Sequence, residues 1–541
     1  MLISCFILQA TAQSTLTTKQ WQEDLRFIQN TIHTDYSFLF VKTTKEIFDI
    51  EVEALYKNIP NLEEHEIIVG MSRIIALFKY GHTDMSFRQK PFEFHYLPFN
   101  LYQYNDGVYL QGVHKDYQQS LGAKVIAINK VPIADALKRI YPAVNSENDQ
   151  YFKAFGINYL RIPEVLHAQG ITKKLENSVE LTLEKGGKTF KQQFTSLQKG
   201  ERAPTKYSHV FQDEKWLEAR NQNNTPLYLK NLDKIYFYEY LPKEKAVYVR
   251  HSQIQDDPTE NTQTFYTRVF DFIEKNDVEK LIIDVRLNGG GNNYKNKDVI
   301  TRIIESKKIN KVGSLFVIIG RRTFSACQNL VNELDNYTNT IFVGEPTAEN
   351  VNFYGDTRKV ALPNSKIPIF LSFAWWQDKS QWENADWTMP HLAVDMSFDE
   401  YTSNQDPVLK VALDFTGSDF IIDPMGHVTD LFLAGEMEKL VQDVSNMVND
   451  ERYQFFDFEA EFNKAGYKML NGGQFEAAIG IFSLVTQLFP NSSNAWNSLA
   501  ESYLKAGAKD KAIEYYKKSF TLDANGPTGK NAKEMLEKLQ K

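Results

Sequence analysis

Apolar side chains recur at helical spacing within the first eighty residues. Between residues 67 and 78 they lie three or four positions apart, as on the buried face of an amphipathic helix. They are Ile67, Ile68, Met71, Ile74, Ile75 and Phe78. The pattern stops at Tyr80-Gly81, where glycine favours the end of a helix. We predict a helical cap over residues 15–90 that carries His82 just past its last helix.

Over residues 91–200 the spacing of apolar side chains changes from that of helices to that of short strands. Strand-like runs lie at 108–113, 123–128 and 179–183, the last before a Gly186-Gly187 turn. We predict a small β-rich module here. Residues 120–129 are similar to the core strand of a PDZ domain, whose exposed sheet edge can take an extended peptide as an added strand. A β-rich spacer is the alternative.

Strand and helix patterns alternate over residues 225–415. The predicted strands are 246–250, 281–286, 314–320 and 341–344, and the predicted helices are 263–275, 295–306 and 325–337. Such alternation predicts an α/β sheet built from crossover units. The fold class is therefore an α/β multidomain protein, and a length of 541 residues agrees with several domains.

A helical linker is expected over 416–454, and residues 455–541 contain an internal repeat. Gly473, Ala478 and Phe482 recur 34 positions later as Gly507, Ala512 and Tyr516. This period resembles that of tetratricopeptide (TPR) repeats, and Leu470 and Leu504 keep the same register. Two such repeats could bind a protein partner through their helical surface.

Charge and hydropathy exclude two classes of partner. The formal net charge is -8 and no basic run would follow a phosphate backbone, so nucleic acid is not expected. After the first dozen residues no apolar stretch reaches the roughly 18 residues that cross a bilayer. We therefore expect no transmembrane span in the mature chain.

The first twelve residues predict export. An apolar run is followed by Ala10-Thr11-Ala12, a small-x-small pattern for signal-peptide cleavage. The protein is then periplasmic, cell-envelope or extracellular, and cytoplasmic if this segment is not a signal; lipidation at Cys5 is a rival interpretation. The chain has two cysteines and no Cys/His cluster with zinc-site spacing, so we expect no metal and no cofactor.

Ser325 is the candidate nucleophile. It lies where the strand 315–319 runs through a short turn into a helix, so its hydroxyl can project from the sheet beside free backbone N–H groups. The alternative is a plain helix N-cap. Cys327, two helical positions later, would point about 200° away and is better interpreted as a small buried residue.

A glycine run follows the preceding strand, 281–286. Gly289, Gly290 and Gly291 let backbone amides approach a ligand closely. With the N–H of Ala326, those of Gly290 and Gly291 could form an oxyanion hole. A nucleotide site is the rival, but neither a Walker lysine nor a G-x-G-x-x-G spacing follows the strand.

Four motifs together resemble a family. They are Tyr80-Gly81-His82-Thr83, the run from Asp284 to Gly291, the run from Gly320 to Ala326, and Val343-Gly344-Glu345-Pro346-Thr347. In this order they resemble the tail-specific protease (carboxy-terminal processing, S41-type) superfamily, from the helical cap to about Leu413. The resemblance implies a serine-type peptidase that hydrolyses proteins or peptides through an acyl-serine intermediate.

The resemblance also implies roles for other residues. The processing-protease branch has a lysine 25 positions after the serine, where this chain has Asn350. The tricorn-like branch instead implies His82 as general base and Glu383, 58 positions after Ser325, as the carboxylate that orients it. That branch has a serine before its histidine, where this chain has Gly81.

Two adjacent arginines are candidates for binding a substrate carboxylate. Arg321 and Arg322 precede the proposed nucleophile, and a guanidinium can pair with a carboxylate through two hydrogen bonds. Solvated turn residues are the alternative.

Two other functions remain open. One is a catalytically degenerate protein of the same fold that binds a ligand or peptide, in which His82 and Ser325 would lie beyond hydrogen-bond reach. The other is a scaffold that grips a partner through its TPR-like repeats.

Overall fold

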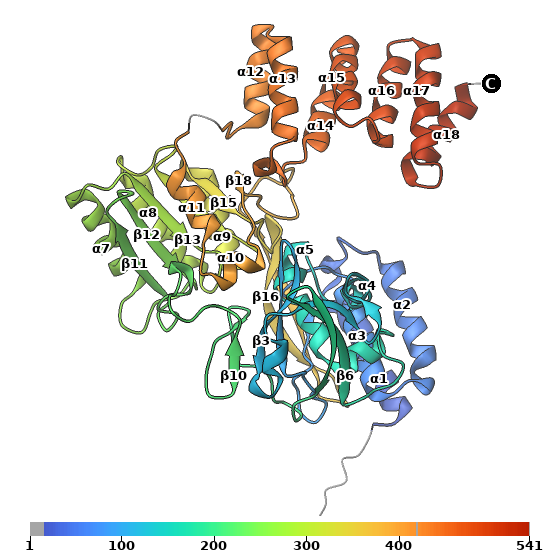
Figure 1. The fold of residues 1–541 in the computed structure, drawn as a ribbon. Helices are drawn as coiled ribbons and strands as arrows, with labels where there is room; N and C mark the ends of the chain where they lie inside the picture. The colour runs from blue at the N-terminus through green and yellow to red at the C-terminus, as the bar shows by residue number, and fades with distance from the viewer. Residues whose placement is uncertain (1–15, 418–419, 540–541) are drawn as a thin grey trace, which may run out of the picture. The chain divides into compact units, whose positions relative to one another are not determined.

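The computed structural model describes residues 16–417 and 420–539, shown in Figure 1. The chain forms two compact units. The first comprises the chain up to Pro390 together with Val394–Phe415, and the second comprises His391–Ala393 and the chain from Thr416 onward. The predicted signal segment 1–12 and Cys5 lie outside the described residues.

The first unit begins with three helices that bury one apolar face each. They are α1 (Thr18–Asp35), α2 (Lys45–Asn58) and α3 (Glu64–Ala76). Capping boxes at Thr17 and Glu63 satisfy backbone N–H groups where α1 and α3 begin. The chain leaves α3, passes through Gly81 and His82, and enters the short strand β1 (Asp84–Met85).

A seven-stranded sheet follows, with central order β10-β3-β4-β6-β7. Strands β2 and β5 pair with β3 and β4. The strands are β2 (Phe99–Tyr104), β3 (Gly107–His114), β4 (Lys124–Ile128), β5 (Val131–Pro132), β6 (Ser178–Lys185), β7 (Lys188–Thr195) and β10 (Trp216–Glu218). Helices α4 (Ile133–Ile140), α5 (Asp149–Ala154) and α6 (Pro163–Ala168) lie between β5 and β6 in the chain. The three strands predicted from the sequence are thus β3, β4 and β6. The likeness to a PDZ domain stays a prediction.

The predicted α/β sheet has the order β11-β12-β13-β14-β15 within the first unit. Its strands are β11 (Tyr236–Leu241), β12 (Ala246–His251), β13 (Lys280–Asp284), β14 (Leu315–Ile319) and β15 (Ile341–Gly344). β11 is antiparallel to β12, and the other pairs are parallel. The crossover helices are α7 (Thr262–Lys275), α8 (Asn296–Glu305) and α9 (Ala326–Tyr337). Since the strands from β12 to β15 are parallel, their carboxyl ends meet at one edge of the sheet.

Alternate positions of these strands enter different packing layers. Leu281, Ile283, Leu315 and Val317 share one buried cluster with the apolar faces of α7, α8 and α9. Phe316, which points to the opposite face, packs against Phe415 just past α11 (Pro407–Asp414). Both faces of the sheet are therefore covered, which explains why its strands are almost entirely apolar.

A long hairpin connects the sheet to the N-terminal helices. β16 (Asn352–Ala361) and β17 (Pro368–Gln377) pair antiparallel, and β1 adds to β17 with Asp84 opposite Phe370. Thr83 Oγ1 also donates to Ser372 Oγ at 2.9 Å. These contacts fix the backbone on the carboxyl side of His82. The remaining short elements of this unit are β8 (Thr205–Lys206), β9 (His209–Val210) and α10 (Phe398–Thr402).

The second unit consists mainly of helices, with the short strand β18 (Leu392–Ala393). The helices are α12 (Pro424–Ala434), α13 (Met437–Val448), α14 (Phe458–Asn471), α15 (Phe475–Leu488), α16 (Ser493–Lys505), α17 (Lys509–Leu522) and α18 (Pro527–Leu539). Leu470, Ala478 and Phe482 pack in one cluster, and Ala512 and Tyr516 in another. The identity of this region as TPR repeats stays a prediction. Within 16–417 and 420–539, none of the helices combines the length and apolar character that a membrane crossing needs.

Candidate active site

Ser325 lies at a strained turn between β14 and α9. Its backbone adopts φ 58° and ψ −131°, a positive φ that side chains other than glycine rarely adopt. Its side chain does not cap the helix, so the N-cap alternative is not what the geometry shows. The backbone N–H of Ser325 donates to the carboxylate of Glu349.

The imidazole of His82 lies against this hydroxyl. His82 Nε2 is 3.0 Å from Ser325 Oγ, within hydrogen-bond reach. The ring is stacked on Phe324 with 4.5 Å between ring centroids and on Phe353 with 6.0 Å between them. With its side chain 15% exposed, the imidazole is held between two aromatic rings and has little freedom to turn.

Glu349 supplies the carboxylate next to the imidazole. It follows β15 in the chain, is fully buried, and its Oε1 lies 3.1 Å from His82 Nδ1. Among the described residues neither atom makes a well-aligned hydrogen bond, so the pair is a close contact. Glu349 thus lies beside both the histidine, through Nδ1, and the serine, through its backbone N–H.

A second buried carboxyl, that of Glu147, lies close to Glu349 and His82. Glu147 accepts from the backbone N–H groups of Gly81 at 2.8 Å and Asn350 at 3.1 Å, so it ties the His82 turn to the loop after β15. Asn350, at the position where the processing-protease branch has its lysine, donates its side-chain amide to the same carboxylate. Sequence spacing contains no signal for Glu147, because it precedes α5 and only the fold brings it here.

Burial controls the protonation of this cluster. It lowers the pKa of His82, which favours a neutral imidazole able to accept a proton. It raises the pKa of both Glu147 and Glu349 well above their ordinary values, and the charge of Glu349 raises that of Glu147 further. Lys42 opposes both shifts. Two adjacent carboxyls in a dry site cannot both ionise freely, so they compete for one proton.

Gly290 of the glycine run packs against Ser325. A Cβ on Gly290, whose φ is +97°, would lie 2.6 Å from Ser325 Cβ and 2.8 Å from Ala326 N. The N–H of Gly290 donates to Asn288 Oδ1 at 2.9 Å and is therefore occupied. Among the hydrogen bonds of residues 16–417, none uses the N–H of Gly291 or Ala326. These two donors remain candidates for an oxyanion hole.

Glu383 does not reach this site. It is exposed, in the loop after β17, and its backbone N–H bonds to Ser380. The carboxylate beside His82 belongs to Glu349, which the spacing of the tricorn-like pattern did not indicate. A usable signal was present, because Glu349 follows a parallel strand adjacent to that of Ser325 and such strands place their loops at one edge.

The two arginines differ in their availability. Arg321 is 4% exposed and pairs with Glu345 through two hydrogen bonds of 2.9 and 2.6 Å, so it has no free face for a substrate carboxylate. Arg322 instead donates to Ser208 Oγ at 2.7 Å and lines a cavity. The prediction that Arg321 binds a substrate carboxylate is therefore wrong. Arg322 remains a candidate, because it lines the cavity.

The surroundings of Cys327 and Gly81 explain why neither position offers a catalytic side chain. Cys327 is fully buried, and burial raises the pKa of its thiol well above the ordinary value, so it is not poised as a nucleophile. A Cβ on Gly81 would lie 2.4 Å from the Tyr151 ring and 2.8 Å from Phe324. Packing thus explains why the serine of the tricorn-like pattern is not found there.

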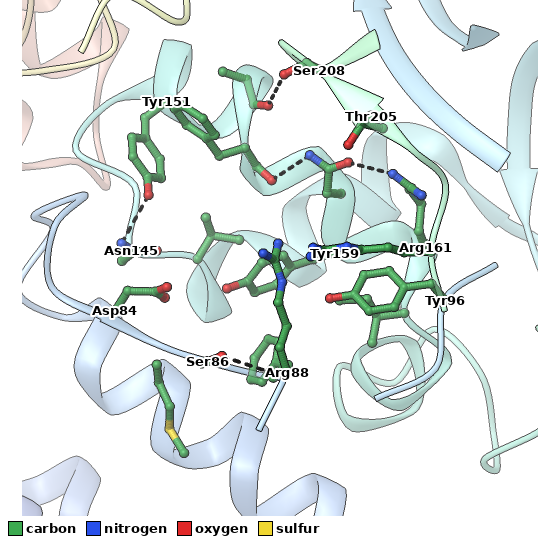
Figure 2. A pocket seen from close by; sticks show the side chains of 18 of the residues that line it. Asp84, Ser86, Arg88, Tyr96, Asn145, Tyr151, Tyr159, Arg161, Thr205 and Ser208 are labelled. Atoms are coloured by element: carbon green, nitrogen blue, oxygen red, sulfur yellow. Dashed lines mark hydrogen bonds between the residues drawn. The ribbon is translucent and has the colours of Figure 1, made fainter. Parts of the chain in front are cut away.

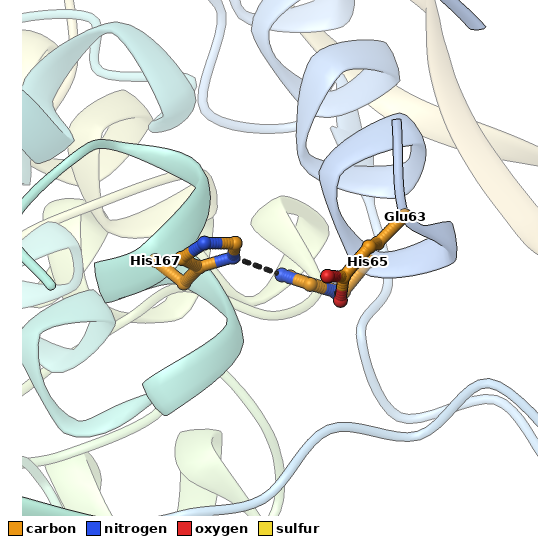
Figure 3. Close-up of side chains that lie close together, drawn as sticks. All are labelled: Glu63, His65 and His167. Carbon is orange, nitrogen blue, oxygen red and sulfur yellow. Dashed lines mark hydrogen bonds and ion pairs between the residues drawn. The ribbon is translucent and has the colours of Figure 1, made fainter. Parts of the chain in front are cut away.

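Folding brings together two groups with metal-ligand side chains that sequence spacing does not reveal. One is the cluster of His82, Glu147 and Glu349; the other is Glu63, His65 and His167, shown in Figure 3. In the second group His65 Nε2 and His167 Nδ1 are 2.7 Å apart and already hydrogen-bonded to each other. Burial and the neighbouring His167 lower the pKa of His65, which favours the neutral form of the His65 imidazole.

Comparisons with known proteins support the fold. Neither family models nor curated proteins match this chain. Solved structures of CPAF do. A mutant of CPAF aligns with a TM-score of 0.52 and 11% identity over 75% of this chain and 100% of its own. Mature CPAF complexed with lactacystin aligns with a TM-score of 0.51 and 11% identity over 74% of this chain and 98% of its own. About three quarters of this chain is thus similar in fold to CPAF.

Proposed function

We propose that this protein is a serine peptidase that cleaves amide bonds through an acyl-serine intermediate on Ser325. The observation that carries the proposal is the 3.0 Å separation of His82 Nε2 and Ser325 Oγ at a strained strand-to-helix turn. A serine hydroxyl is a weak nucleophile until a base takes its proton, and a neutral imidazole is suited to that task. The fold similarity to CPAF agrees with it.

Each group of the site has a role in the proposed reaction. Ser325 Oγ attacks the carbonyl carbon while its proton passes to His82 Nε2. Glu349 fixes the Nδ1–H tautomer and stabilises the imidazolium. The imidazolium then protonates the amine as it leaves, so that an ester to Ser325 remains. Water attacks this ester while its proton passes to His82, the imidazolium gives a proton to Ser325 Oγ as the ester bond breaks, and the carboxylic acid product leaves.

The developing alkoxide needs hydrogen-bond donors. The N–H groups of Ala326 and Gly291 are those that neighbouring groups have not occupied, and Ala326 begins helix α9, whose dipole favours negative charge. The N–H of Gly290 can join them only if it leaves Asn288. The main role that we assign to Gly290 is steric: its lack of a side chain leaves room for Ser325, which any side chain there would displace.

The helices of the second unit are proposed as a protein-binding region. The support is the 34-residue period that aligns Ala478 with Ala512 and Phe482 with Tyr516, all buried in their helices. Such a region would recruit a protein substrate or partner to the peptidase.

A substitution of the nucleophile tests the proposal. Ser325→Ala should abolish peptide hydrolysis and labelling by a fluorophosphonate while the far-UV circular dichroism spectrum stays unchanged. Ser37→Ala, at an exposed serine of the N-terminal helical region, is the matched control and should retain both. Turnover that survives Ser325→Ala would overturn the assignment of Ser325 as nucleophile. A wild-type protein that neither hydrolyses peptides nor reacts with the fluorophosphonate would instead favour a binding protein of the same fold.

A further inference from the structure

A cavity of about 560 Å³ opens beside the candidate active site. This size lies within the roughly 300–1,000 Å³ that is usual for ligand pockets. Figure 2 shows the labelled side chains of Asp84, Arg88, Tyr96, Tyr159 and Arg161 around it. Arg202 and Arg322 also line it.

Residues close in the chain to the proposed catalytic groups line the cavity. Asp84 comes two positions after His82, and Arg322 comes three before Ser325. Tyr151, another lining residue, donates its hydroxyl to the carbonyl of Gly81 at 3.1 Å and packs on Phe324 with 5.5 Å between ring centroids. A peptide held at Ser325 therefore has this cavity next to its scissile bond.

Positive charge in the cavity is not balanced. Four guanidinium groups line it against a single carboxyl, that of Asp84. None of the four arginines belongs to an ion pair among those of residues 16–417. Burial lowers the pKa of Arg161 to about 10, and the positive charges of Arg202 and Arg88 add to the shift. The arginines thus act on one another, and Arg161 keeps its charge at neutral pH.

The two less exposed arginines of the cavity have hydrogen-bond donors to spare. Arg161 is 4% exposed, and among residues 16–417 its guanidinium donates only to the neutral side chains of Asn100 and Asn158. Its Nε, and likewise the Nε of Arg322, is buried without a hydrogen-bond partner among the described residues. A buried donor on a charged group is costly to leave unpaired, so these atoms favour an acceptor that enters from outside.

Two other arginines of the same unit are paired with carboxylates. Arg286 pairs with Asp284 and Asp406, and Arg321 pairs with Glu345. Arg250 donates to three backbone carbonyls, but its Nε too is buried without a hydrogen-bond partner among the described residues. An unpaired Nε is therefore not confined to the cavity, and what distinguishes Arg161 and Arg322 is that they line a space which an acceptor can enter.

We propose that this cavity is a subsite that binds a carboxylate group of the peptide substrate. The proposal rests on the peptidase function proposed above. A guanidinium matches a carboxylate in shape and charge, and Arg161 and Arg322 supply the unpaired donors while Arg88 and Arg202 draw the anion in. The carboxylate has two sources, an aspartate or glutamate side chain beside the scissile bond or the free carboxy terminus of the substrate.

Binding is measured on the Ser325→Ala full chain, so that the result does not depend on turnover. Three fluorescent peptides of one sequence are compared: an amidated peptide with a single glutamate, the same peptide with glutamine instead, and the glutamine peptide with a free carboxy terminus. We expect one of the two carboxylate peptides to bind roughly ten- to a hundredfold more tightly than the neutral one, the range for a charge-assisted hydrogen bond. Which of them gains affinity identifies the source. Equal affinity of all three overturns the proposal, even where the wild-type protein hydrolyses peptides.

Arginine variants locate the effect. Arg322→Gln and the double variant Arg88→Gln/Arg202→Gln, all in the Ser325→Ala background, should reduce the preference for the carboxylate peptide at least threefold while the neutral peptide binds as before. Arg88 and Arg202 are exposed, so the double variant should fold even where a change at Arg322 does not. Arg73→Gln, an exposed arginine of α3 outside the cavity, is the matched control. A preference that survives in both cavity variants contradicts the assignment.

Discussion

His82 Nε2 and Ser325 Oγ lie 3.0 Å apart although 243 positions separate them in the chain. The distance depends on two independent pieces of structure. The β14–α9 turn fixes the serine, and the pairing of β1 with β17 fixes the chain just after the histidine. A substitution that loosens either support should therefore lower activity before it unfolds the protein.

The geometry and the family pattern disagree about which glutamate assists His82. Because Glu349 lies 3.1 Å from His82 Nδ1 whereas Glu383 is exposed, Glu349→Gln should lower kcat by about 10²- to 10⁴-fold. Glu383→Gln, the matched control, should leave kcat within about threefold of the wild-type value. The measurement is steady-state hydrolysis of a fluorogenic peptide. The opposite ranking of the two variants would return the role to Glu383.

The contrast between these two glutamates shows how far the sequence can be used. Strand, turn and helix-end patterns place Ser325 and His82 locally in the chain, whereas the role of His82 is implied only by the resemblance to a family. Glu349 follows the strand adjacent to that of Ser325, but a spacing taken from a distant family pointed elsewhere. The edge formed by parallel strands is a physical rule, and it would have placed Glu349 correctly.

Other features could not be predicted because they depend on long-range packing. Glu147 reaches the site from a loop that no strand or helix pattern links to it. Arg321 and Arg322 are neighbours in sequence, yet Arg321 pairs with Glu345 whereas Arg322 lines the cavity. Adjacency in the chain carries no information about which side of a turn a side chain takes.

The buried carboxyl of Glu147 should make stability depend on pH. Its pKa is raised in the folded state, mainly by burial, so the folded protein binds this proton more tightly than the unfolded chain does. Stability is then greatest below the unfolded pKa of about 4.3 and falls as pH rises toward the folded pKa, by at most about 1.4 kcal/mol per pH unit for one proton. Glu147→Gln removes this loss. The melting temperature of the variant relative to wild type should therefore increase between pH 4.5 and pH 8.

Thermal scans of both proteins at the two pH values test this expectation. The comparison cancels the hydrogen bonds that glutamine cannot reproduce, because their loss is nearly independent of pH. A difference in melting temperature that stays constant would show that Glu147 titrates in the folded protein as it does in the unfolded chain, and one that decreases with pH would show that folding lowers its pKa.

The glycine run offers a matched pair of substitutions. A Cβ at Gly290 would lie 2.6 Å from Ser325 Cβ in a backbone conformation with positive φ, whereas at Gly289 the nearest group is Arg322 Nη2 at 4.0 Å. Gly290→Ala should reduce kcat/KM roughly a hundredfold or more, through displacement of the nucleophile and of the Ala326 N–H. Gly289→Ala should change it by less than about threefold. Similar losses in both variants would mean that the run acts through flexibility and not through close packing on Ser325.

The helices of the second unit contain a second matched pair, which tests the packing between α14 and α15. A Cβ at Gly466 on α14 would lie 2.5 Å from the Phe482 ring, while nothing lies within 4 Å of the same atom at Gly480 on α15. Gly466→Ala should therefore destabilise the helix pair by about 1–3 kcal/mol, the usual cost of overpacking. Gly480→Ala should stabilise it by roughly 0.5–1 kcal/mol, since alanine is the better helix former at an exposed position. Hydrogen exchange of the α14 and α15 amides measures both changes locally. Faster exchange in Gly480→Ala, or unchanged exchange in Gly466→Ala, would contradict the close contact between the two helices on which the repeat interpretation depends.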